Sequence, residues 1–193
     1  MQVDTPVRER VMRAAISLFA AKGFGATSIR EIADAAGVTK GGVYHYFESK
    51  DDLLFEVYTR MLRMQTSRMR TMADDDSLPL PQRLHAIVAD VVETSIANLE
   101  EAVVFFQSVH LLAADRQDQV RAERRAYQDR VRDLVAEGQA TGVFRTDVPA
   151  DLIVNYHLGA IHRLGSWYRA DGPLTAEQVG THFADLMLAS LRP

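Results

Sequence analysis

Residues 27–50 read TSIREIADAAGVTKGGVYHYFESK, and this stretch decides the fold that the sequence predicts. Ser28 and Glu31 have the spacing of a capping box, in which two side chains satisfy the free backbone N–H groups at the start of a helix. Gly37 follows the apolar stripe of that helix and supplies the left-handed conformation that ends many helices. Thr39 is a residue type expected at the start of a second, very short helix. Two short helices about a glycine-containing turn predict a helix-turn-helix.

The second of these helices contains two adjacent glycines, Gly41 and Gly42. Each glycine destabilises a helix by roughly 1 kcal/mol relative to alanine, so a sequence selected for stability alone would not keep both. Threonine, lysine, tyrosine and histidine surround the two glycines, and this composition suits a recognition helix in the major groove of DNA. We therefore expect DNA to approach this backbone closely.

The N-terminal region resembles the TetR family of bacterial transcriptional regulators. The similarity covers residues 7–54, in which a first amphipathic helix ends in LFAAKGFGATSIREIADAAGV and is followed by TKGGVYHYFESKDDLL. A second stretch, WYRADGPLTAEQVG at residues 167–180, resembles a subgroup of this family that controls fatty-acid or steroid catabolism and senses CoA thioesters. The resemblance implies a DNA-binding domain at residues 1–50 and a ligand-binding and dimerisation domain at residues 51–193.

The expected DNA contacts fall into three groups. Candidates for contacts with base edges and thymine methyl groups lie on the first turns of the recognition helix. They are Thr39, Lys40, Gly41, Tyr44 and His45. The resemblance implies that Tyr46 and Lys50 reach phosphates. Two roles stay open for Thr27, a phosphate contact at a helix start and simple capping. The full set is Thr27, Thr39, Lys40, Gly41, Gly42, Tyr44, His45, Tyr46 and Lys50.

The composition excludes several classes of protein. None of the 193 residues is cysteine, so disulfides, thiolate nucleophiles and thiolate metal sites are ruled out. The net charge is −4, but residues 1–50 carry seven Lys and Arg against five Asp and Glu, whereas the remainder carries fifteen against twenty-one. A slightly basic head on an acidic body suits a protein that touches DNA with one small face. No apolar stretch approaches the ~20 residues that span a bilayer, and we expect a cytoplasmic protein without a membrane partner.

Helical periodicity runs through nearly the whole chain, and alternating Val/Ile/Thr-rich runs are absent. The sequence therefore predicts an all-α fold of about nine helices, with a three-helix head, a larger helical body and no sheet. Thr5 is expected to cap the first helix, with Pro6 at its first position. A long helix should run from residue 49 to about 73, roughly 36 Å at 1.5 Å per residue. Later helices are expected at about 81–99, 102–112, 116–141, 147–168 and 175–191.

The last two of these helices are the expected dimer interface. A head this small buries too little DNA surface for high specificity, so we expect a homodimer that places two heads roughly 34–36 Å apart on a palindromic operator. Apolar stripes along residues 152–167 and 179–191 predict a four-helix contact between subunits. Packing within one subunit is the alternative explanation of both stripes. The residues assigned to the interface are Gly159, Arg163, Trp167, Val179, Phe183, Leu186 and Met187.

Aromatic and histidine side chains in the body are candidates for an effector cavity, although buried aromatic residues also form ordinary cores. They are Phe105, Phe106, His110, Tyr127 and Tyr156. The arginines at positions 121, 124, 125, 163 and 169 either hold an anionic group, such as the phosphates of CoA, or form a solvated charged face. His157 and His162 are about 140° apart around a helix, and no H-E-x-x-H or E-x-x-H motif is present, so we expect no metal site and no cofactor.

Together these patterns predict a homodimeric, ligand-responsive transcriptional repressor that a small-molecule effector releases from its operator. The resemblance suggests an acyl-CoA thioester as the effector. A transcriptional activator, or a DNA-binding protein that needs no ligand, is the alternative within the same class. A small helical enzyme is the alternative from another class. The sequence argues against an enzyme because it lacks a thiol, a G-x-S-x-G elbow, a phosphate-binding loop and a carboxylate–histidine ligand motif.

Overall fold

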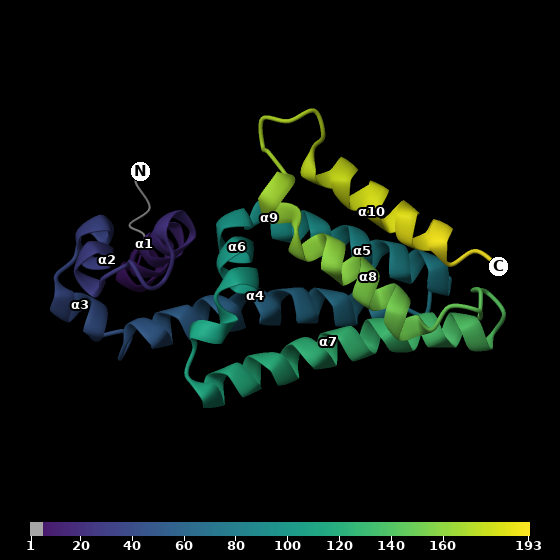
Figure 1. The fold of residues 1–193 in the computed structure, drawn as a ribbon, viewed down its shortest axis with the longest axis horizontal. Coiled ribbons are helices and arrows are strands. Elements are labelled where there is room, and N and C mark those ends of the chain that lie inside the picture. The colour runs from purple at the N-terminus through teal and green to yellow at the C-terminus, as the bar shows by residue number, and fades with distance from the viewer. Residues whose placement is uncertain (1–5) are drawn as a thin grey trace. The chain divides into compact units, whose positions relative to one another are not determined.

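The computed structural model describes residues 6–193, and this part of the chain consists of helices and their connections, without a strand (Figure 1). The predicted all-α fold is confirmed. The helices are α1 (Val7–Lys22), α2 (Ile29–Ala36), α3 (Lys40–Tyr44), α4 (Lys50–Ala73), α5 (Leu80–Ala97), α6 (Leu99–Gln107), the 3-10 turn η1 (Val109–Leu111), α7 (Ala114–Ala140), α8 (Ala150–His162), α9 (Leu164–Trp167) and α10 (Ala176–Ser190). Only Arg163 separates α8 from α9, and its backbone angles are nearly helical (φ −92°, ψ −3°). Counting α8 and α9 as one interrupted helix gives nine α-helices in the described residues, the number that was predicted.

The predicted helix ends are formed by the expected local interactions. At the start of α2 the Glu31 N–H donates to Ser28 Oγ at 3.2 Å, and the Ser28 N–H donates to Glu31 Oε2 at 2.8 Å. Gly37 ends α2 with φ 66° and ψ 40°, a conformation that costs glycine little because it has no Cβ. The predicted cap at Thr5 lies outside the described residues. Pro6 precedes the first helical residue, Val7, so α1 begins one residue later than predicted.

Contacts divide the chain into two compact units. Unit 1 contains α1 to α3, α4 as far as Met61, and Glu100–Val120; unit 2 contains Leu62–Leu99 and Arg121–Pro193. Because α4 and α7 are continuous helices, each contributes residues to both units. The predicted functional division at residue 50 is a different partition of the chain, and it stays a prediction.

The core of unit 1 holds the helix-turn-helix in place. The inner side of α1 is buried along its length, and Ile32 of α2 and Val43 of α3 are fully buried as well. Two ion pairs join α1 to α4, Arg8 with Glu56 at 2.7 Å and Arg60 with Glu9 at 2.9 Å. These pairs are partly exposed, so each adds little to stability, and the apolar contacts dominate.

The core of unit 2 is formed by the apolar sides of α5, α7, α8 and α10. Its largest fully buried side chains include Leu84, Ile87, Leu134, Leu164, Met187 and Leu191. Helix α10 packs closely along α5, as Figure 1 shows, and Gly180 permits this approach because a Cβ there would lie 2.9 Å from the backbone oxygen of Ala89. Among residues 6–193 no helix is long and apolar enough to cross a membrane.

Candidate nucleic-acid interface

Helix α3 is only five residues long, and its neighbours hold it in position. The Thr39 side chain caps it by accepting from the Gly42 N–H at 3.0 Å. Val43 and Phe47 are buried and anchor the inner side of the helix. A helix this short is not stable alone, so these anchors are what fix its outer side in a defined orientation.

The outer side of α3 presents six exposed residues in succession or nearly so: Thr39, Lys40, Gly41, Tyr44, His45 and Tyr46. Lys40 Nζ lies 5.6 Å from the centre of the Tyr44 ring, and the His45 and Tyr46 rings meet edge to face at 4.8 Å. A Cβ added to Gly41 would meet no atom closer than the Thr39 hydroxyl at 3.8 Å. The surface therefore combines a cation, hydrogen-bonding aromatic groups and an uncovered backbone.

The Lys50 ammonium group ties α4 to the connection between α1 and α2. Its Nζ donates to the backbone oxygens of Phe24 and Thr27, at 2.8 Å each, and lies 4.3 Å from the centre of the Phe24 ring. Burial lowers the pKa of Lys50. An ammonium group has three N–H donors, so one remains for a further acceptor after these two bonds.

Thr27 has a structural position that the sequence did not reveal. Its side chain is 2% exposed, and its hydroxyl donates to the backbone oxygen of Gly23 at 2.9 Å. The start of α2 is instead occupied by the carboxylate of Glu31, whose pKa is lowered to about 2 by hydrogen bonds from Lys22 and Ser28. Since an ionised carboxylate already fills this helix start, neither of the roles considered for the Thr27 hydroxyl, phosphate contact or capping, fits its geometry.

The five residues predicted to line one effector cavity are not gathered in one place. In unit 1, Phe105 is buried against Tyr58 and Phe106, each ring centre 5.0 Å away, while His110 is exposed. In unit 2, Tyr127 is buried, whereas Tyr156 is 73% exposed. Phe105 and Tyr127 thus have the core positions that were the alternative explanation for aromatic residues.

Tyr127 does line a small apolar cavity inside unit 2, together with a histidine that the sequence analysis did not assign to a cavity, His157. The cavity has a volume of about 10 Å³, room for about one water molecule. Burial lowers the pKa of His157. Burial also raises the pKa of Tyr127, and the negative charge of Asp90 raises it further. Both groups are therefore neutral near pH 7. The signal for His157 was its place among the apolar residues of α8.

The residues predicted for the dimer interface divide into two sets. Gly159, Arg163, Trp167 and Leu186 are exposed, and Phe183 stacks on Trp167 with ring centres 6.3 Å apart and planes 8° apart. Val179 and Met187 are instead buried in the core of unit 2. Their assignment to the interface is corrected, because they lie on the side of α10 that packs against α5.

An exposed short helix, held by a capped turn against an apolar core, defines a helix-turn-helix protein with a separate helical body. Two family models match the chain: "Bacterial regulatory proteins, tetR family" over residues 11–57, and "Tetracyclin repressor-like, C-terminal domain" over residues 77–191. The chain belongs to the TetR family of bacterial transcriptional regulators.

Individual relatives agree with this assignment. The chain is 30% identical to the HTH-type transcriptional repressor KstR2 of Mycolicibacterium smegmatis, over 99% of this chain and 96% of that protein. The solved structure of the ketosteroid transcriptional regulator KstR2 of Mycobacterium tuberculosis is similar with a TM-score of 0.90 and 27% identity, covering 100% and 97% of the two chains. The TetR family regulator PfmR of Thermus thermophilus has a TM-score of 0.86 and 27% identity, covering 95% and 100%. The predicted function, a ligand-responsive DNA-binding transcriptional regulator, is confirmed.

Proposed function

We propose that this protein is a homodimeric repressor that binds operator DNA with α3 and leaves it when a small-molecule effector binds the body. The outer surface of α3 carries this proposal, because it offers DNA-contacting groups around an uncovered Gly41 backbone. Two relatives that span nearly the whole chain, the KstR2 proteins of Mycolicibacterium smegmatis and Mycobacterium tuberculosis, are named repressors, which favours repression over activation. The protein acts by binding rather than by catalysis, in the cytoplasm, where bacterial DNA is found.

The DNA contacts follow from the exposed groups of unit 1. Thr39, Lys40, Tyr44 and His45 face base edges, while the bare backbone at Gly41 and Gly42 lets α3 enter the major groove deeply. Tyr46 and the remaining N–H of Lys50 bind phosphates, which position the helix without reading sequence. The hydroxyl of Thr27 is left out of this set because its position in the fold commits it to Gly23.

A second copy of the chain covers the exposed apolar side of α8 to α10. Leu152, Tyr156, Trp167 and Leu186 are large apolar side chains that remain 48% to 73% exposed in one subunit. Such a group of exposed apolar residues marks an interaction surface, and Gly159 allows the two copies of α8 to approach closely. A two-fold dimer of this kind reads a palindromic operator with half-sites one helical turn apart.

The effector is an acyl-CoA thioester whose acyl part enters unit 2 beside Tyr127 and His157. The cavity there has a volume of only about 10 Å³, so binding must enlarge it, and Met187 in its wall has the flexible side chain that repacking needs. Because α4 is one continuous helix with residues in both units, a displacement of α4 in unit 2 moves its N-terminal half as well. A coupling of about 1–3 kcal/mol would change operator affinity roughly 5- to 150-fold.

The test is fluorescence anisotropy with DNA from the region upstream of the protein's own gene, with and without acyl-CoA esters of different chain lengths. We expect a saturable complex of two subunits per operator, measured by light scattering, and dissociation at effector concentrations that do not affect an unrelated DNA-binding protein. A reporter gene behind this DNA should be transcribed more when the effector is present. Binding that no small molecule weakens would contradict the release step, and transcription that falls with the effector would identify an activator.

A further inference from the structure

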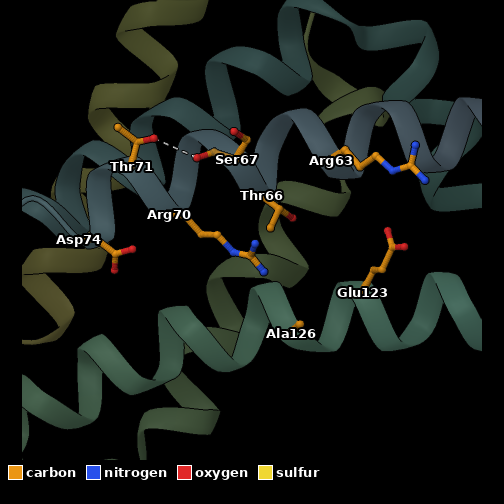
Figure 2. A pocket seen from close by; sticks show the side chains of 8 residues that line it. All are labelled: Arg63, Thr66, Ser67, Arg70, Thr71, Asp74, Glu123 and Ala126. Atoms are coloured by element: carbon orange, nitrogen blue, oxygen red, sulfur yellow. Dashed lines mark hydrogen bonds between the residues drawn. The ribbon is translucent and has the colours of Figure 1, made fainter.

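A groove of about 530 Å³ lies between α4 and α7 within unit 2 (Figure 2). The α4 side is one polar face of that helix, since its residues recur every three or four positions. The opposite face of α4 is buried in the core of the unit. The residues that line the groove are Arg63, Thr66, Ser67, Arg70, Thr71 and Asp74 from α4 and its end, and Glu123 and Ala126 from α7.

Two arginines in this groove have no hydrogen-bond or ion-pair partner among the described residues. Across residues 6–193 no hydrogen bond or ion pair involves the guanidinium groups of Arg63 and Arg70, whereas Asp74 is already paired with Arg130 at 2.6 Å. Figure 2 shows the Arg70 guanidinium directed from α4 toward α7, between the two helices. The groove is therefore lined by two available guanidinium groups and the hydroxyls of Thr66 and Ser67, all of which can donate hydrogen bonds.

One carboxylate opposes these cations. Glu123 projects from α7 toward the side of the groove on which Arg63 lies, and no ion pair joins the two in the described residues (Figure 2). With Asp74 neutralised by Arg130, the two arginines outweigh Glu123 and the groove attracts anions. On the α7 side of the groove, the small side chain of Ala126 leaves space between the two helices.

We propose that this groove binds the phosphate groups of a phosphorylated small molecule, with Arg63 and Arg70 holding separate anionic groups. The two residues are seven positions apart, which is about 10 Å along the helix, so they suit a ligand with two phosphate sites rather than one isolated ion. Guanidinium groups bind phosphate oxygens through paired N–H donors. This inference rests on the proposed function for the ligand's identity: the groove takes the 3′-phosphate and pyrophosphate of the CoA thioester effector.

The volume and polarity of the groove fit this part of the ligand. Small-molecule sites commonly measure about 300–1,000 Å³ and are mostly apolar where they hold apolar groups. The groove is within that range but is polar and charged. The apolar cavity is lined by a different side of α7, since Ala126 of the groove and Tyr127 of the cavity are adjacent residues about 100° apart around the helix. A ligand with a polar and an apolar end matches the two sites.

The test is titration calorimetry on the full-length protein without DNA, using coenzyme A, inorganic pyrophosphate and pantetheine, which lacks the phosphates. Coenzyme A should bind, pantetheine should bind at least 10-fold more weakly, and Arg63→Gln and Arg70→Gln should each weaken coenzyme A binding about 10-fold. Ala126→Leu, which fills the groove without changing charge, should weaken it as well. Glu123→Gln should strengthen binding, a change of opposite sign that a general loss of structure does not produce.

Arg192→Gln is the matched control, because it removes one exposed arginine of unit 2 that does not line the groove. It should leave coenzyme A binding within about 2-fold. Equal affinity for coenzyme A and pantetheine, or equal effects of Arg70→Gln and Arg192→Gln, would overturn the proposal. Pyrophosphate binding that depends on Arg63 and Arg70, without coenzyme A binding, would overturn the assignment to CoA. Each result is independent of operator binding, so a failure here is distinguishable from a failure of the proposed repressor function.

Discussion

Gly41 in α3 and Gly138 in α7 differ in what surrounds them. A Cβ on Gly138 would lie 2.8 Å from Cγ of the Phe144 ring and closer still to its Cδ2, and the nearest atom to a Cβ on Gly41 is 3.8 Å away. Phe144 cannot easily move, since it is buried and its N–H donates to the Gly138 oxygen at 2.9 Å. Packing inside unit 2 therefore explains Gly138, while nothing in the described residues requires glycine at position 41.

The difference shows how to recognise a residue type that packing within its own subunit does not explain. A glycine at position 41 destabilises α3 by roughly 1 kcal/mol relative to alanine, and no packing constraint among the described residues compensates for this. Leu186 poses the same question on α10, because an apolar side chain that is 65% exposed is not explained by its own subunit. We assign the first to DNA and the second to another copy of the chain.

The largest expected effect is on Gly138. Gly138→Ala should lower the free energy of unfolding by about 3 kcal/mol, at the upper end of the range for overpacked cores, because the added methyl overlaps a buried ring. Urea denaturation followed by circular dichroism measures this. Gly41→Ala is the matched control and should leave stability unchanged or raise it by up to ~1 kcal/mol. If the two alanine variants were equally stable, the contrast between the two glycines would be wrong.

The second prediction concerns operator affinity, for which we expect Gly41 to be the sensitive glycine. Gly41→Leu should fold and dimerise normally but should lose about 30-fold in operator affinity, roughly 2 kcal/mol, because the side chain separates α3 from the bases. Gly41→Ala should lose less, so that affinity falls with side-chain size. Anisotropy titrations at one fixed salt concentration measure both, since protein–DNA affinity depends strongly on salt. Wild-type affinity in a folded, dimeric Gly41→Leu variant would refute the role of α3.

The sequence was sufficient for features that depend on neighbouring residues. The capping box at Ser28 and Glu31, the helix end at Gly37 and the exposed outer side of α3 follow from short-range spacing, and the structure has all three. The all-α fold was predictable for the same reason, because helical periodicity is local. The long helix predicted at residues 49 to 73 agrees with α4 to within one residue.

Features that depend on distant contacts were not predictable. Periodicity gave α10 an apolar stripe but did not tell Met187, which packs on the core, from Leu186, which faces outward. Tyr127 and Tyr156 are the same residue type, and only the fold buries one and exposes the other. The groove between α4 and α7 is not predictable either, because Arg63 and Arg70 have the sequence pattern of an ordinary solvated helix face.

The third prediction tests Leu186 against another exposed position of the same helix. Leu186→Asp should weaken dimerisation at least 10-fold, about 1.4 kcal/mol, because it places a charge in an apolar contact while leaving the core of unit 2 intact. Sedimentation velocity across a dilution series measures the dimer, and thermal unfolding checks the fold. Thr181→Asp is the control for charge, because Thr181 is exposed and lies about 140° from Leu186 around α10. A Leu186→Asp variant that remains dimeric at all concentrations would show that α10 is not at the interface.

The smallest expected effect is the loss of folding stability at acid pH that His162 causes within unit 2. Burial, and then the positive charge of Arg124, lower the pKa of His162 to about 4, and Arg124 Nη2 lies 3.4 Å from His162 Nε2. The unfolded chain has an ordinary histidine pKa near 6.5, so between about pH 6.5 and pH 4 it binds more protons than the folded protein, and stability falls as the pH falls. His162 is only partly buried, so solvent screening reduces the effect to about 1 kcal/mol between pH 7 and pH 5.

Urea denaturation at pH 7 and pH 5 measures this loss. His162→Gln should be less sensitive to acid than the wild type, because glutamine takes up no proton in either state. Arg124→Gln should also reduce the sensitivity, since removing the neighbouring cation lets His162 accept a proton at a higher pH. A wild type that loses no more stability than His162→Gln would mean that this histidine is solvated and free to protonate in the folded protein.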